Sequence, residues 1–245
     1  MTVKIYLSLF ILCAIQFKAQ VLDEYPKNQD FYEGGIVNFY KEANEYFIKT
    51  NAKECDNHEI YQPRIIVTKD KTVKLIQDAD RENIIKNKCA YDLSIELIKN
   101  LKNWKPAVVK GMTLGAITEF IIYPKDILSN YKTGYNSEKF VVEAQYPKGY
   151  EAFKKEFDAN FKTLFVDYHI NGEINLEFYI NKDGNIINAR IYPSVDNADF
   201  NKDLMRTLGR LKNNWNPAMY SNIPIKQRIA FPIRFSVNFT ERQTE

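Results

Sequence analysis

Two groups of side chains in this sequence have types and spacing that could support chemistry. The first is the segment Cys55-Asp-Asn-His58-Glu59, which together with Cys89 offers two thiols, an imidazole and a carboxylate. These are zinc-binding groups, but their spacing matches no standard zinc pattern. In an oxidising compartment a cysteine pair more often forms a disulfide. We therefore predict a Cys55–Cys89 disulfide, with a metal site on the same residues as the alternative.

The second group is His169 beside Asp167, in the segment VDYHING. A histidine next to a carboxylate can serve as a general base, but the sequence offers it no nucleophile in a recognisable turn. A histidine in a surface loop is the simpler interpretation. We therefore predict no catalytic residue, no cofactor, no metal ion and no small-molecule substrate, and so no enzyme activity.

The overall composition is that of a folded protein. The chain has 245 residues, of which 45% are apolar, and its 34 basic and 31 acidic residues leave a net charge of +3. That length and apolar fraction are sufficient for one large core or two small ones. The charges are spread along the chain without a basic stripe, so we predict no nucleic-acid partner.

Residues 1–20 have the pattern of a secretory signal peptide. Lys4 supplies positive charge, a mainly apolar run extends from Ile5 to Phe17, and Ala19-Gln20 follows. Thirteen residues of helix span only about 20 Å, less than the roughly 30 Å hydrocarbon core of a bilayer. We predict cleavage near Ala19 or Gln20 and a periplasmic mature protein, with an uncleaved membrane anchor as the alternative.

The two tryptophans reveal an internal repeat. Trp104 and Trp215 lie 111 residues apart, and each follows Leu-Lys-Asn and precedes a Pro-Ala pair. Upstream of each, leucines recur every three or four residues, which predicts a helix with one apolar face. We expect Asp92 and Asp203 near the helix starts, where a carboxylate suits the exposed amides. The prolines beyond the tryptophans, Pro106 and Pro217, are expected to end the helices. The leucines are Leu93, Leu97 and Leu101 in the first copy and Leu204, Leu208 and Leu211 in the second.

A β-hairpin is predicted upstream of each of these helices. Residues 174–180 alternate apolar and polar side chains, Asp183-Gly184 supplies a tight turn, and residues 186–191 return. The first copy reads RIIVTKDKTVKLI, with Asp70-Lys71 at the turn. Lysine tolerates a left-handed backbone less well than glycine, so we expect a different turn in the first copy.

An opening helix and a closing strand complete each copy. A tyrosine-proline pair, Tyr25-Pro26 or Tyr146-Pro147, precedes a helix, and a strand with one apolar face ends the copy. The predicted fold is therefore α+β: two tandem domains, each a helix–hairpin–helix–strand unit with a small antiparallel sheet packed on two helices. We place the domains at residues 21–130 and 131–245. The expected buried helix faces are Ile36, Tyr40, Ala43 and Phe47 in the first copy and Tyr150, Phe153, Phe157, Phe161 and Leu164 in the second; the strand faces are Leu114, Ala116, Thr118, Phe120 and Ile122 in the first, and Ile225, Ile229, Phe231, Ile233, Phe235, Val237 and Phe239 in the second.

The repeat also bears on the cysteines. The first copy is longer by ten residues, and its extra segments contain Cys55, before the first hairpin strand, and Cys89, after the second. Both therefore fall towards the open end of that hairpin. A disulfide between them would contribute roughly 3–4 kcal/mol to stability.

Residues 146–239 resemble the C-terminal domain of TonB, the periplasmic end of the transducers that drive outer-membrane receptors. The resemblance rests on Tyr146-Pro147, on the strand and turn in INGEINLEFYINKDGNIINARIYPSVD, on LKNNWNPA, and on Pro232-Ile-Arg-Phe235 within NIPIKQRIAFPIRFSV. Each motif is weak alone, but together they span ninety residues. Residues 25–124 carry the same frame in degenerate form, without the turn glycine or the last-strand proline.

The resemblance implies that an extended peptide adds beside the last strand. An exposed strand edge offers unpaired N–H and C=O groups that a peptide can satisfy, and proline within a strand is usually at an edge. The partner would be a segment of an outer-membrane receptor or another periplasmic protein, and the function would be linked to transport across the outer membrane. The predicted contact residues are Arg228, Ala230, Pro232, Arg234 and Ser236.

One departure from the family limits this expectation. TonB transducers have an uncleaved membrane helix and a long proline-rich spacer, whereas the nine prolines here are scattered. We therefore do not expect this chain to transmit force by itself. The alternative function is that of a structural or assembly protein, in which the two domains pair with each other or the chain forms a homodimer, and no receptor is bound.

Overall fold

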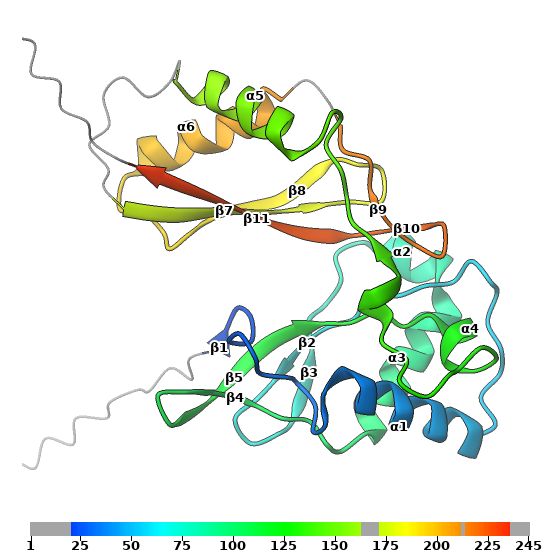
Figure 1. Cartoon of the computed structure of the whole chain (residues 1–245). Helices are drawn as coiled ribbons and strands as arrows, with labels where there is room; N and C mark the ends of the chain where they lie inside the picture. The colour runs from blue at the N-terminus through cyan, green and yellow to red at the C-terminus, as the bar shows by residue number, and fades with distance from the viewer. Residues whose placement is uncertain (1–20, 163–171, 212–213, 236–245) are drawn as a thin grey trace, which may run out of the picture. The chain divides into compact units, whose positions relative to one another are not determined.

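The computed structural model describes residues 21–162, 172–211 and 214–235. The predicted leader and the pair His169 and Asp167 lie outside these ranges, as do Ser236 and the ends of two predicted apolar faces, Leu164, Val237 and Phe239. The chain divides into two compact units, residues 1–135 and 136–245 (Figure 1). In the part of the chain that is described, no helix is both long enough and apolar enough to cross a membrane.

The first unit contains a five-stranded sheet and two principal helices. The strand order is β1-β5-β2-β3, with β4 also paired to β5. The β1–β5 pair is parallel and the other pairs are antiparallel, so the prediction of a purely antiparallel sheet is wrong for this unit. The elements are β1 (Val21–Leu22), α1 (Gly35–Lys49), β2 (Arg64–Val67), β3 (Val73–Leu75), α2 (Arg81–Lys86), α3 (Lys88–Asn100), β4 (Ala107–Val109), β5 (Met112–Glu119) and α4 (Pro124–Ile127).

An aromatic core joins the helices of the first unit to its sheet. The apolar face of α1 is buried, and the ring of Phe39 lies 4.6 Å from that of Phe120 and 5.8 Å from that of Trp104. Trp104 is 2% exposed, as predicted, but it lies beyond the end of α3 at Asn100 and not on the predicted helical stripe. Burial of such large rings is the dominant favourable contribution to folding in a unit of this size.

The second unit has a smaller sheet covered on one face by two helices (Figure 1). That sheet has the order β11-β7-β8, and a second one has the order β10-β9-β6. The core contains Phe153 and Phe157 from the first helix, whereas Tyr150 is 46% exposed, contrary to the predicted helix face. The elements are η1 (Ser137–Phe140), β6 (Val141–Val142), α5 (Tyr150–Lys162), β7 (Gly172–Ile180), β8 (Ile186–Tyr192), α6 (Ala198–Gly209), β9 (Ala218–Tyr220), β10 (Ile223–Ile225) and β11 (Gln227–Phe235).

The helix boundaries differ from the predicted ones. Asp203 lies in the middle of α6, whose N-cap is Asn197; the side chain of Asn197 accepts a hydrogen bond from the backbone N–H of Phe200 at 2.9 Å. Asp92 lies in the second turn of α3 and forms an ion pair with Lys88. Both helices also end several residues before the prolines. A helix is capped by the residue just before its first turn, whose side chain accepts a hydrogen bond from a free backbone N–H. Asn197 occupies that position in α6, so Asp203 cannot be the cap.

The two units anchor a tyrosine in the same way, but in the first unit this tyrosine is not the one in the tyrosine-proline pair. The Tyr146 hydroxyl donates to Glu156 at 2.7 Å, and its ring packs edge-on against Trp215. In the first unit these contacts are made by Tyr32, which donates to Glu42 at 2.5 Å and packs edge-on against Trp104. Tyr25, in the matching tyrosine-proline pair, instead donates to the Lys105 carbonyl.

The hairpin turns of the two units are alike, contrary to prediction. In the second unit the N–H of Gly184 donates to the Asn181 carbonyl at 3.0 Å, with φ of 81° at the glycine. In the first unit the N–H of Lys71 donates to the Thr68 carbonyl at 3.0 Å, with φ of 65°. Lysine therefore accepts the left-handed conformation, at a modest energetic cost, because the Thr68 and Asp70 side chains close the turn.

Candidate functional site

The last strand of the second unit lies at the edge of its sheet. Strand β11 pairs antiparallel with β7 over nine residues, and β8 pairs with the other side of β7. Among the described strands β11 has no second neighbour. Within the described residues, the main-chain N–H and C=O groups along its outer edge therefore pair with no other strand, which is the arrangement that strand addition requires.

The side chains of β11 alternate between the core and the open face of the sheet. Phe231 is 3% exposed and its ring contacts those of Phe153 and Phe157 at 5.0 Å, so the inward face fixes the strand against α5. Ala230, Pro232 and Arg234 are exposed and Arg228 is partly exposed, as the alternation predicts. Pro232 within this strand fits its edge position, because proline lacks a ladder donor.

A buried carboxylate lies at the centre of the open face. Glu177 of β7 is 6% exposed and receives two guanidinium groups, one from each neighbouring strand. Arg228 of β11 approaches one carboxylate oxygen at 2.6 Å, and Arg190 of β8 approaches the other at 2.6 Å. Two charge-assisted contacts compensate for taking this carboxylate out of water, and they tie all three strands together.

Sequence reasoning missed the role of Glu177, although a signal was present. The residue is acidic within an alternating strand, and basic residues occur on both strands that flank it in the predicted sheet. The pairing register, which places Arg190 and Glu177 opposite each other, was needed to show the contact. That register includes a bulge near Asn188, which has φ of 51°, and bulges cannot be located from alternation alone.

The rest of the open face is mainly basic and aromatic. Arg234 pairs with Glu173 at 2.9 Å, and both side chains are substantially exposed. The Lys226 ammonium lies 5.2 Å from the Tyr179 ring centre, and the Arg190 guanidinium lies 5.9 Å from that of Tyr192. Basic side chains therefore outnumber acidic ones beside the β11 edge.

The hairpin turn and Trp215 hold the sheet against the helices. The N–H of Trp215 donates to the Gly184 carbonyl at 2.9 Å. A side-chain carbon at Gly184 would lie 1.9 Å from the Trp215 carbonyl oxygen, so only glycine allows this approach. Trp215 is 5% exposed, which agrees with the core role expected for it.

In the first unit, Cys55 and Cys89 form the predicted disulfide, with their Cα atoms 5.7 Å apart. Because both thiols are in the disulfide, neither is available as a ligand for the alternative metal site. The Glu59 carboxylate accepts hydrogen bonds from the N–H groups of Cys89 and Ala90, at 2.7 and 3.2 Å, near the start of α3. His58 is exposed and contacts Asp56. Within the described residues, no three metal-binding side chains come together.

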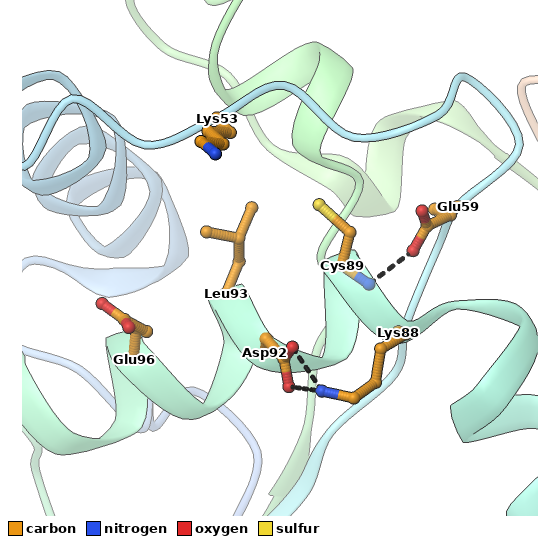
Figure 2. A pocket seen from close by; sticks show the side chains of 7 residues that line it. All are labelled: Lys53, Glu59, Lys88, Cys89, Asp92, Leu93 and Glu96. Carbon is orange, nitrogen blue, oxygen red and sulfur yellow. Dashed lines mark hydrogen bonds and ion pairs between the residues drawn. The ribbon is translucent and has the colours of Figure 1, made fainter.

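An open pocket of about 380 Å³ lies beside the disulfide (Figure 2). Most of its wall is one face of α3, while Glu59 and Lys53 approach from other segments. Lys88 and Asp92 pair with each other, and Glu59 caps the helix. The polar groups in the wall thus mostly serve the local structure, and the pocket resembles no catalytic arrangement. Its lining is Lys53, Glu59, Lys88, Cys89, Asp92, Leu93 and Glu96.

Comparison with known proteins finds a similarity within the second unit. Residues 167–237 match the family model of the Gram-negative bacterial TonB protein C-terminal domain. The match covers β7 through β11, the part that carries the open edge, and does not extend to α5 or to the first unit. This family is non-catalytic and periplasmic, and its members bind TonB-dependent receptors. No curated protein and no solved structure matches the chain significantly.

Proposed function

We propose that the second unit is a non-enzymatic periplasmic module that binds an extended receptor peptide by strand addition beside β11. The observation that carries this proposal is the outer edge of β11, which has no strand partner among the described residues, within a segment that matches the TonB C-terminal family. The added peptide would pair with the β11 main chain, while its side chains pass Arg228, Ala230, Pro232 and Arg234. Ser236, the remaining predicted contact residue, lies outside the described residues and stays a prediction.

The first unit is a second, degenerate copy of the same domain. The strand order β5-β2-β3 repeats as β11-β7-β8. The register repeats too: Thr118 lies opposite Ile65, and Ile229, 111 residues after Thr118, lies opposite Phe178. The tyrosine–glutamate hydrogen bond and the tyrosine–tryptophan packing described above occur in both units. A duplication explains these matches better than chance, because they involve both the backbone and the side chains.

The alternative function is assembly, in which the β11 edge takes a second copy of this chain or another part of the same protein. Sheet edges are usually covered in stable proteins, and the basic residues beside β11 do not decide between a peptide and another sheet. Identification of the partner in cells separates the two functions.

A photo-crosslinking amino acid at position 230 tests the proposal. Ala230 is small and exposed on the edge strand, so a probe there should not disturb the core. The expected result is capture of an N-terminal segment of an outer-membrane receptor, identified by mass spectrometry. The control probe replaces Lys155, an exposed residue of α5, and should capture no receptor. Capture of this chain itself through position 230 would instead support assembly and contradict receptor binding.

A further inference from the structure

The edge of the first unit that corresponds to β11 carries a strand of its own. Strand β1 pairs in parallel with β5, with Val21 opposite Gly115 and Leu22 opposite Ala116. On its other side, Ala116 pairs with Val67 of β2. Strand β1 is therefore an added strand on the outer edge of the last strand, the position that has no described strand in the second unit.

The segment after β1 is held by hydrogen bonds to the chain just before β5. The Gln29 side chain donates to the Val108 carbonyl at 2.7 Å and accepts from the Val108 N–H at 2.8 Å, as a neighbouring strand would. The Tyr25 hydroxyl donates to the Lys105 carbonyl at 2.7 Å. These contacts keep β1 close to its site, and a tethered segment has a far higher effective concentration than a free peptide.

Few buried side-chain contacts hold β1 against β5. Gly115 offers β1 no side chain to pack against; a carbon added there would lie 3.5 Å from a Val21 methyl, an ordinary van der Waals distance. Val21 is 39% exposed, and neither β1 residue belongs to the buried core of the unit. The pairing is therefore mainly a main-chain interaction with little apolar burial, so its loss should leave the core intact.

We propose that β1 is an intramolecular ligand of the first unit, which occupies the strand-addition edge of β5 and closes it to other extended segments. The partner that fits this edge is an extended peptide in parallel orientation, and residues 21–22 are the occupant supplied by the chain itself. The inference does not depend on what β11 binds, because it rests on contacts within the first unit.

Paired substitutions in the full chain test this proposal. Val21→Pro with Leu22→Pro removes both main-chain donors of β1, whereas Val21→Ala with Leu22→Ala keeps them and removes only side-chain contacts. Hydrogen–deuterium exchange should become at least about tenfold faster near Gly115–Ile117 in the proline variant, and change much less in the alanine variant. Exchange in β11 should not change in either. Unaltered exchange of β5 in the proline variant would overturn the proposal.

A peptide added in trans tests whether the edge accepts another strand. The probe is a fluorescent peptide with the sequence AQVLDEY, which is residues 19–25 of this chain. Its anisotropy should rise with the proline variant and not with the unaltered chain, and its crosslinks should map to β5. Equal binding to both proteins, or faster exchange without peptide capture, would contradict the proposal. So would an unaltered chain that forms dimers by exchanging residues 21–22 between copies.

Discussion

At the scale of single residues, Gly184 is the glycine at which one added carbon should lower stability most. Gly184→Ala places a carbon 1.9 Å from the Trp215 carbonyl oxygen and also strains a backbone with φ of 81°. We expect a loss of roughly 2–4 kcal/mol in the free energy of unfolding of the second unit. Chemical denaturation, followed by Trp215 fluorescence in a Trp104→Phe background, measures it.

Gly149 supplies a matched control for that experiment. Its φ is 87°, but a side-chain carbon there would meet nothing within 4 Å. Gly149→Ala should therefore cost only the backbone strain, about 1 kcal/mol. Equal losses of unfolding free energy for Gly149→Ala and Gly184→Ala would show that the close approach of Trp215 to the turn contributes nothing to stability.

Glu177 is the residue on which the open face depends. Glu177→Gln keeps the shape of the side chain but leaves Arg190 and Arg228 without their shared carboxylate. Since both arginines are partly exposed, we expect a loss of about 1–3 kcal/mol in unfolding free energy, less than for a fully buried pair. Glu173→Gln, which breaks the exposed pair with Arg234, should cost under about 1 kcal/mol. A larger effect at Glu173 would contradict this ranking.

Two tyrosines in the first unit, the buried Tyr61 and the partly buried Tyr25, should make that unit sensitive to alkali. Burial raises the pKa of Tyr25 and Tyr61, and the nearby Asp78 raises that of Tyr61 further. The unfolded chain therefore loses these protons first, near pH 10, so stability is constant below that pH and falls as the pH rises above it. Tyr25→Phe or Tyr61→Phe should flatten this fall, and the two substitutions together should flatten it more than either alone. The free energy of unfolding, measured between pH 8 and 11 for the unaltered chain and for each variant, tests this prediction.

At the scale of elements, the sequence predicted the helices and strands whose apolar residues recur at a regular spacing. The two principal helices of each unit, the hairpins, the last strands and the outward row Arg228, Ala230, Pro232 and Arg234 follow from apolar spacing, and the structure contains them. The family match confirms the TonB-like assignment for residues 167–237. The disulfide followed from where the two extra segments lie relative to the first hairpin.

The errors arose where a few atoms decide the structure. The apolar stripes were expected to continue along the helices to Trp104 and Trp215, but α3 and α6 end before the tryptophans. Lys71 was expected to change the turn, yet its neighbours support the same conformation. The parallel strand β1 has two residues, too few for any periodic pattern to reveal. Such features depend on tertiary contacts, which local sequence preferences do not encode.

The disulfide is an element-scale constraint on the first unit. It joins the segment before β2 to the start of α3 and closes a loop with a sequence separation of 34 residues. Replacing Cys55 and Cys89 together by serine should lower the unfolding free energy by about 3–4 kcal/mol, mostly through the unfolded state. Thermal unfolding with and without a reductant measures the effect in the unaltered chain, and the serine variant should no longer respond to the reductant.

At the scale of the whole molecule, each unit has its own core, and this should be visible in unfolding. The principal core cluster of the first unit contains only residues between Phe31 and Tyr135, while Phe153, Trp215 and Phe231 pack within the second. We therefore expect two transitions in calorimetry. Reduction should lower the melting temperature of one transition, and Gly184→Ala should lower that of the other.

This independence separates structural effects from effects on binding. If the units unfold separately, reduction of Cys55–Cys89 should leave crosslinking through position 230 unchanged. Gly184→Ala should abolish that crosslinking at temperatures above the lowered melting temperature of the second unit in this variant. A single transition that both changes shift together would show that the units fold as one body. Loss of crosslinking on reduction would then mean that the β11 edge depends on the first unit, and that the first unit is needed for binding.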